Sequence, residues 1–94
     1  MSGRFVPRMS ALAQRQLRND LSEDVAISVL AFAQRTLAAD PRACGSPLDG
    51  PDDGVWRMRR RDYTVYYEID DHAGEVTITA VRPTGGEKRF TPAR

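Results

Sequence analysis

Apolar and polar residues alternate over Gly54–Asp70, and this is the strongest pattern in the chain. Because successive side chains of a strand point to opposite faces, the alternation predicts two β-strands that meet at a tight corner at residues 60–62. One face of the predicted hairpin is apolar and holds Trp56, Met58, Tyr63, Val65, Tyr67 and Ile69. The opposite face holds Val55, Arg57, Arg59, Thr64, Tyr66 and Glu68. The hairpin therefore has one side suited to a core and one basic side.

Helical spacing characterises the N-terminal part of the chain. Ser10 is a candidate N-cap for a short helix that ends near residues 19–20, and Ser22 is a candidate N-cap for a second helix. Asp40-Pro41 ends the second helix, because a residue before proline is disfavoured in the α region. The positions at helical spacing are Leu12, Ala13, Gln16 and Leu17 in the first helix, and Ile27, Val29, Leu30, Ala31, Phe32 and Leu37 in the second. We expect an antiparallel helical hairpin whose apolar stripe packs on the sheet.

The other segments predict short strands and turns. Arg4–Val6 is a candidate edge strand that Pro7 ends, and residues 41–54 form a loop that Leu48 anchors in the core. Glu75–Val81 alternates and predicts a third main strand, and residues 87–90 a short extended piece. The predicted fold class is α+β, in which an N-terminal helical hairpin packs on a small, mainly antiparallel sheet of three to four strands. One domain spans residues 1–94.

The net charge is only +1, so attraction to nucleic acid has to come from the placement of the charges. Four arginines fall within residues 57–61, and Arg82, Lys88 and Arg89 can join them from adjacent chain. A solvated strand surface is the simpler interpretation of such a run. The alternation against Trp56 and Met58 favours a patch that faces phosphates. Tyr66, on the basic side, is the candidate for stacking on a base.

Several functional classes are not indicated. The only cysteine, Cys44, excludes an internal disulfide and is typical of a reducing compartment. The chain has no signal-peptide core and no membrane-length apolar run, so we expect a cytoplasmic protein without a membrane partner. No metal-ligand spacing, phosphate loop or nucleophile elbow is present, so no cofactor is expected. The only histidine, His72, falls in an acidic turn, where a solvated residue is expected.

Three segments carry a family resemblance: Leu37–Pro41, Pro47–Gly50 and Gly54–Asp70. The last one, with its Trp56-Arg57 and Asp62-Tyr63 elements, resembles the W-R-x-R and D-Y-R-V-x-Y elements of the RelE/ParE superfamily of bacterial toxins. The resemblance implies an α+β toxin of a type II toxin–antitoxin pair, with a cognate antitoxin that wraps the domain. In that superfamily the RelE branch cuts messenger RNA on the ribosome, and the ParE branch poisons DNA gyrase.

The resemblance also implies site residues. RelE-like nucleases use two basic residues on the first hairpin strand, which Arg57 and Arg59 match, and basic residues near the C-terminus, for which Lys88 and Arg89 are the candidates. We expect these four to form the catalytic set, with Arg60, Arg61, Tyr66 and Arg82 binding RNA. Because an arginine side chain stays protonated, Arg57 and Arg59 suit phosphate binding better than proton transfer. Two positions depart from the family pattern: Thr64 replaces the arginine after Asp62-Tyr63, and Phe90 replaces a C-terminal tyrosine.

Three functions stay open on the sequence. The first is a ribosome-dependent endoribonuclease, whose partners are the antitoxin, the ribosome and mRNA. The second is a gyrase inhibitor of the ParE type, which needs no nuclease residues. The third is a degenerate homologue that binds only its antitoxin and, through it, operator DNA.

Overall fold

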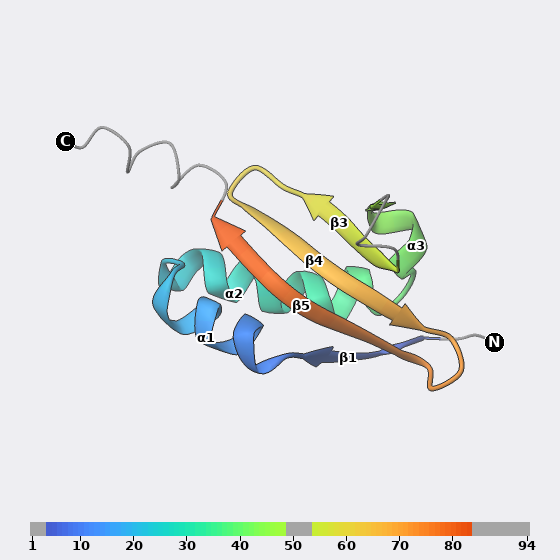
Figure 1. Cartoon of the computed structure of the whole chain (residues 1–94). Coiled ribbons are helices and arrows are strands. Elements are labelled where there is room, and N and C mark those ends of the chain that lie inside the picture. The colour runs from blue at the N-terminus through green and yellow to red at the C-terminus, as the bar shows by residue number, and fades with distance from the viewer. Residues whose placement is uncertain (1–3, 49–53, 84–94) are drawn as a thin grey trace.

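The computed structural model describes residues 4–48 and 54–83, in which helices cover one face of a sheet (Figure 1). The elements are β1 (Val6–Met9), α1 (Ala11–Asn19), α2 (Glu23–Ala31), η1 (Phe32–Leu37), α3 (Pro41–Cys44), β2 (Ser46–Pro47), β3 (Val55–Arg59), β4 (Tyr63–Asp70) and β5 (Glu75–Pro83). The strand order is β1-β5-β4-β3-β2, and every pairing is antiparallel except that of β1 with β5. The predicted α+β class is confirmed, with five strands in place of three or four.

Both predicted N-caps are confirmed. The hydroxyl of Ser10 accepts a hydrogen bond of 3.0 Å from the backbone N–H of Ala13, and that of Ser22 accepts one of 3.3 Å from Val25. Each bond satisfies a backbone donor that the first turn of a helix leaves free. The sequence therefore placed the starts of α1 and α2 correctly.

The apolar stripe of the second helix was predicted only in part. Val29, Phe32 and Leu37 are buried as expected, but Ile27 is 57% exposed and Leu30 is 42% exposed, and Ala31 is also on the surface. A helix packed on one sheet face buries a single stripe of side chains. The apolar residues of this helix cover a wider part of its circumference, so some of them remain exposed. η1 continues α2 as a π-helix, in which the N–H of Ala38 bonds to the carbonyl of Ala33 five residues back.

A bulge in β5 changes the face on which its last residues lie. Tyr66 pairs with Ala80 but Tyr67 pairs with Ile78, so Thr79 is an extra residue in the ladder. Val76, Ile78 and Val81 are all buried as a result, although strict alternation would put Val81 on the outer face. These side chains meet Tyr63, Val65 and Tyr67 of β4 beneath the helices.

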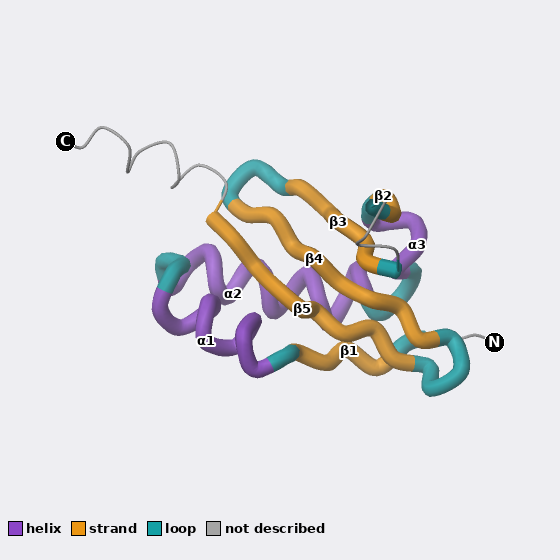
Figure 2. Tube along the Cα trace, viewed as in Figure 1, coloured by secondary structure: helices purple, strands orange, loops and turns teal. Residues whose placement is uncertain are grey.

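The edge strand β1 differs from its prediction. Pro7 lies inside the strand and does not end it, and the strand runs parallel to β5 (Figure 2). The N–H groups of Val6 and Ser10 donate to Gly74 and Ile78, so the nitrogen of Pro7 faces away from β5. A proline is tolerated there because an outward-facing edge position needs no ladder hydrogen bond.

Past the end of β1, side chains at the start of α1 and within it bond to the edge of β5. The hydroxyl of Ser10 donates to the carbonyl of Thr79 at 2.9 Å, and the side-chain oxygen of Gln16 accepts from the N–H of Val81 at 2.7 Å. The side chain of Gln16 thus replaces the carbonyl of a neighbouring strand. This arrangement fixes the C-terminal end of α1 beside the last residues of β5.

The predicted loop at residues 41–54 contains two short elements, α3 and β2, and Leu48 is half-buried without joining the core cluster. The anchoring residue of this segment is Pro41, which is buried. The hydroxyl of Tyr67 donates a 2.7 Å hydrogen bond to the Pro41 carbonyl. The extended piece predicted at residues 87–90 lies outside the described residues.

Candidate nucleic-acid interface

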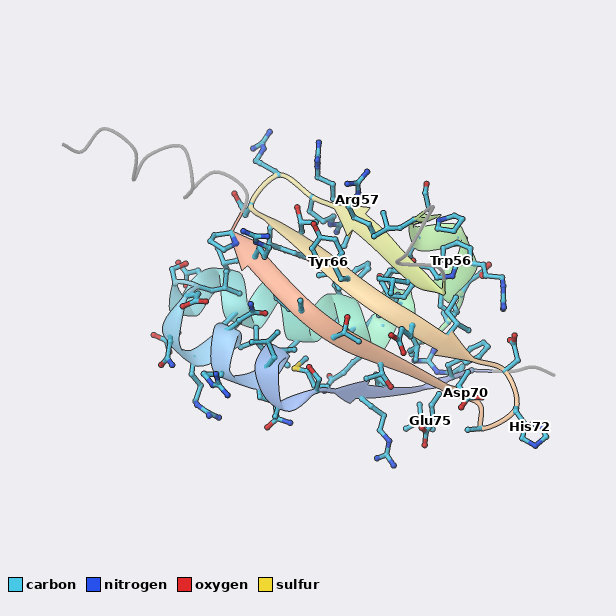
Figure 3. The ribbon with its side chains drawn as sticks, in the orientation of Figure 1. Trp56, Arg57, Tyr66, Asp70, His72 and Glu75 are labelled. Carbon is cyan, nitrogen blue, oxygen red and sulfur yellow. The ribbon has the colours of Figure 1, made fainter. Side chains whose placement is uncertain are left out.

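Two rows of side chains cross β3, β4 and β5 on the face turned away from the helices. Arg57 pairs with Tyr66, which pairs with Ala80, and in the next row Arg59 pairs with Thr64, which pairs with Arg82. Figure 3 shows Arg57 and Tyr66 close together on neighbouring strands. We call this surface the open face and define it by Arg57, Arg59, Thr64, Tyr66 and Arg82. It brings together four of the eight predicted site residues.

The backbone beneath Arg57 is held in place by close packing. The Trp56 ring stacks on the Tyr67 ring with centroids 6.3 Å apart, and Met58 is buried. Gly45 lies against this strand. A β-carbon added at Gly45 would be 2.8 Å from the Tyr67 hydroxyl oxygen and closer than that to the Arg57 carbonyl oxygen. The exposed guanidinium of Arg57 therefore extends from a rigid strand.

Electrostatics leave Arg57 and Arg59 available to a ligand. Among residues 4–48 and 54–83, the Arg8–Glu75 ion pair at 3.2 Å and the Arg42–Asp71 ion pair at 2.7 Å involve neither Arg57 nor Arg59. Arg57 and Arg59 are both exposed and lie two residues apart on one strand. Two cations at this spacing repel each other weakly and favour a polyanion that neutralises both.

The corner of the hairpin divides the arginine run. The Arg60 guanidinium lies over the Phe32 ring, 5.4 Å from its centroid, on the helix side of the sheet. Together with Arg35 and Arg61 it lines a hollow of about 390 Å³, which also includes Asp62 and Tyr63. Arg60 and Arg61, predicted to bind RNA, therefore line a different surface from Arg57 and Arg59.

A cleft lies beside the open face, between α1 and β5. Its volume is about 570 Å³, and its lining residues are Leu12, Gln16, Asn19, Asp20, Tyr66, Ala80, Val81, Arg82 and Pro83. Tyr66 and Arg82 belong both to this α1–β5 cleft and to the open face. The α1 residues had been assigned only to a helix and its end, because no sequence signal shows that α1 follows the edge of β5.

His72 and the C-terminal candidates do not add to the open face as described. His72 is exposed in the turn between β4 and β5, at the end of β4 opposite to Tyr63 (Figure 3). Eight residues of β4 separate the two ends, a distance of about 23 Å at the usual rise of a strand. Lys88, Arg89 and Phe90 lie outside the described residues. The described chain ends at Pro83, which lines the α1–β5 cleft.

Comparison with known proteins identifies the family. The family model described as the ParE toxin of the type II toxin–antitoxin system parDE matches residues 8–86. A curated Mycobacterium tuberculosis protein named Toxin RelE is 33% identical over 86 residues, which are 92% of this chain and 88% of that protein. The chain belongs to the RelE/ParE superfamily of type II toxins. The superfamily inferred from the sequence motifs is confirmed.

Solved structures agree with this membership. The RelBE2 toxin–antitoxin complex of M. tuberculosis contains a chain that is 30% identical, with a TM-score of 0.83, and the match covers 86% of this toxin and 99% of that chain. The isolated E. coli RelE toxin matches at a TM-score of 0.68 and 15% identity, over 92% of this toxin and 98% of that chain. The second match shows the shared fold alone.

The described part of the toxin is better equipped for binding anions than for moving protons. Burial raises the pKa of Tyr67 to about 12, and its hydroxyl is committed to Pro41. Burial also raises the pKa of the Cys44 thiol, which donates to the Asp40 carbonyl at 3.3 Å. Neither group is a base near neutral pH. The open face therefore offers guanidiniums that stabilise a charged phosphate, without an evident acid–base pair among its own residues.

The structure describes residues 4–48 and 54–83, and neither a metal site nor a membrane-spanning helix is found among them. No group of His, Cys, Asp and Glu side chains in these ranges has an arrangement that could hold a metal ion. No helix in them has both the length and the apolar character needed to cross a membrane.

Proposed function

We propose that this toxin is a ribosome-dependent endoribonuclease that cleaves messenger RNA bound at the open face. The observation that carries the proposal is the pair of cross-strand rows, in which Arg57, Arg59 and Arg82 surround Tyr66. Arginines and an aromatic ring on one surface suit single-stranded RNA, because guanidiniums bind the phosphates and the ring stacks on a base.

In this proposal Arg57 and Arg59 clamp the phosphate at the cleavage site. RNA cleavage through the 2′-hydroxyl builds negative charge on a pentacoordinate phosphate, and fixed cations stabilise that charge more than they stabilise the ground state. Because arginine stays protonated, another group has to accept the 2′-hydroxyl proton and supply a proton to the leaving oxygen. Lys88, with Arg89 beside it, remains the candidate for this role in the protein, and the ribosome supplies the rest of the positioning.

The partner that restrains this activity is a cognate antitoxin. The RelBE2 relative was solved as a toxin–antitoxin complex. In this toxin several large apolar side chains on the helices are exposed: Leu12 by 45%, Ile27 by 57% and Leu30 by 42%. Exposed apolar side chains of this size are suited to contact with a partner protein. We propose that the antitoxin covers these helices, and that operator DNA is reached only through the antitoxin.

The decisive experiment adds purified toxin to a reconstituted translation reaction and maps the 5′ ends of the messenger RNA. We expect cuts in translated RNA and none in the same RNA without ribosomes. A supercoiling assay with purified gyrase runs in parallel. Inhibition of gyrase without RNA cleavage would overturn the proposal in favour of the gyrase-inhibitor alternative. Absence of both effects in a toxin that still binds its antitoxin would indicate the degenerate homologue.

A further inference from the structure

The α1–β5 cleft has the size and the walls of a site for one nucleobase. Its volume of about 570 Å³ lies within the roughly 300–1,000 Å³ typical of small-ligand sites. Tyr66 is one of its lining residues, and Leu12, Ala80 and Pro83 add apolar surface. An aromatic ring with aliphatic neighbours suits the flat face of an unstacked base.

The polar rim of the cleft comes from the end of α1. Asn19 is the last residue of the helix, and Asp20 is its C-cap. The last carbonyls of a helix lack partners and carry partial negative charge, so this end accepts hydrogen bonds and disfavours an anion. This end of the cleft therefore favours hydrogen-bond donors on a bound ligand, whereas the cation that lines the cleft is Arg82 of β5.

The Asp20 carboxylate has no structural task in the described residues. Its backbone N–H caps the helix by bonding to the Gln16 carbonyl at 2.9 Å, which any residue can do. The carboxylate itself makes no hydrogen bond or ion pair with a described residue. By contrast, the side-chain oxygen of Gln16 already accepts a hydrogen bond from the N–H of Val81, and only the side-chain NH2 group of Gln16 is left to contact a ligand. Asp20 is thus the acceptor on the rim that can bind a ligand through two oxygens.

We propose that the α1–β5 cleft binds one unstacked base of the RNA substrate and that Asp20 makes guanine the preferred base. The Watson–Crick edge of guanine presents two adjacent donors, N1–H and the N2 amino group, which match the two oxygens of one carboxylate. Adenine and cytosine present one amino group beside an acceptor nitrogen, and uracil presents one N–H between two carbonyls. A bidentate pair of this kind discriminates between bases by about tenfold or more.

This inference names the specificity of the proposed nuclease and rests on that function. Tyr66 and Arg82 connect the two, because both residues line the cleft and also lie on the open face. A base that enters the cleft brings its flanking phosphate toward Arg82, and the neighbouring phosphates continue over the rows of Arg57 and Arg59. One bound nucleotide would therefore set which phosphate is cut.

The test measures binding first, because binding does not depend on cleavage. Purified toxin is titrated with short single-stranded RNAs that differ at one position, which is guanosine, inosine or adenosine. Inosine lacks only the N2 amino group. We expect the wild type to bind the guanosine RNA about tenfold more tightly than the inosine RNA, and Asp20→Asn to abolish most of this difference. Glu23→Gln, which removes one negative charge at the start of α2 and lies outside the cleft, is the matched control and should keep the preference.

Cleavage mapping then gives a second readout. We expect the wild-type cuts to lie at a fixed distance from a guanosine, and the cuts made by Asp20→Asn to lose this bias. Equal affinity of the wild type for guanosine and inosine RNAs would overturn the inference, as would an unchanged preference in Asp20→Asn, even if ribosome-dependent cleavage is observed. A guanosine preference in binding without any cleavage would support the cleft and refute the proposed nuclease. Thermal unfolding of each variant verifies that the fold is intact.

Discussion

Arg57 of β3 lies directly opposite Tyr66 of β4, so a guanidinium and an aromatic ring occupy neighbouring positions on one face of the sheet. Side chains paired in this way have β-carbons about 5 Å apart, within the span of a single nucleotide. Arg59, two residues along β3, extends the cationic surface. RNA binding at this face predicts the effects of the following substitutions.

Replacing Arg57 and Arg59 together with alanine should abolish growth inhibition while the protein remains folded. If each guanidinium neutralises one phosphate of a single strand, the slope of log affinity against log salt should decrease by about 1.4 in magnitude. RNA-binding titrations at several salt concentrations measure this slope. The control is Arg15→Ala with Arg18→Ala, an equal change of charge at exposed positions of α1. Full toxicity of the Arg57 and Arg59 variant would argue against the open face.

Arg60→Ala should affect stability more clearly than RNA cleavage. Its guanidinium lies over the Phe32 ring on the helix side, and an exposed cation–π contact contributes about 0.5–1 kcal/mol. We expect the free energy of unfolding to fall by that amount in urea titrations, with cleavage reduced much less than in Arg57→Ala. Arg60→Lys, which keeps the charge, should recover part of the loss. Equal losses of cleavage in Arg60→Ala and Arg57→Ala would show that RNA also reaches the corner of the hairpin.

Tyr67→Phe should destabilise the toxin by about 1–3 kcal/mol near neutral pH, because the buried Pro41 carbonyl loses the hydrogen bond that the Tyr67 hydroxyl donates. The same substitution should alter the alkaline limb of the stability curve. Burial raises the pKa of Tyr67 from 10.0 to about 12, so above pH 10 the unfolded chain has lost this proton while the folded chain keeps it. Unfolding then releases a proton, and wild-type stability should fall as the pH rises from about 10 to about 12.

The size of this alkaline loss is about 2–3 kcal/mol for a pKa difference near two units. Urea unfolding at about pH 8 and about pH 11 should show about half of this loss, roughly 1.4 kcal/mol, because pH 11 lies midway between the two pKa values. The difference between wild type and Tyr67→Phe isolates this tyrosine from the others. Tyr66→Phe is the control, because that ring is only half-buried and lies on the open face. The explanation would be wrong if wild type and Tyr67→Phe lost the same stability between the two pH values.

Gly45→Ala should destabilise the toxin by about 1–3 kcal/mol, the usual cost of overpacking. The added methyl group would collide with the Arg57 carbonyl and approach the Tyr67 hydroxyl, so β3 has to shift. We also expect weaker RNA binding, since Arg57 moves with its strand. Ala43→Ser, at an exposed position in the same segment, is the control. An unchanged free energy of unfolding in Gly45→Ala would contradict this prediction, because it would show that β3 can shift without loss of stability.

The main elements of the fold could be predicted from sequence because their signals are local. Ser10 and Ser22 begin helices, and the alternation in Gly54–Asp70 gives the β3–β4 hairpin with its buried and exposed faces. The parallel pairing of β1 could not be predicted, because it joins residues nearly seventy positions apart. The bulge at Thr79 was also missed, since each of its residues fits a regular strand equally well.

The candidate site was predicted to a similar extent. Arg57, Arg59, Tyr66 and Arg82 meet on one face because strand alternation and pairing place them there. Arg60 and Arg61 belong to a corner, where alternation ends, and their direction depends on Phe32 and the helix behind them. Asn19 and Asp20 were not predicted as site residues, because their proximity to Tyr66 is set by tertiary packing of α1 on β5.

The hydrogen bond from Val81 to Gln16 also determines how the sheet can extend. The edge of β5 continues past the last residue of β1, and a strand from a neighbouring molecule could pair there. The backbone N–H of Val81 cannot join such a pairing, because it already donates to the side chain of Gln16. At the other edge, β2 pairs with only Trp56 and Arg57 in the described residues. Intermolecular strand addition is therefore blocked at the part of the β5 edge beside α1, whereas the part of β3 that β2 does not pair, next to the arginines, could accept a strand.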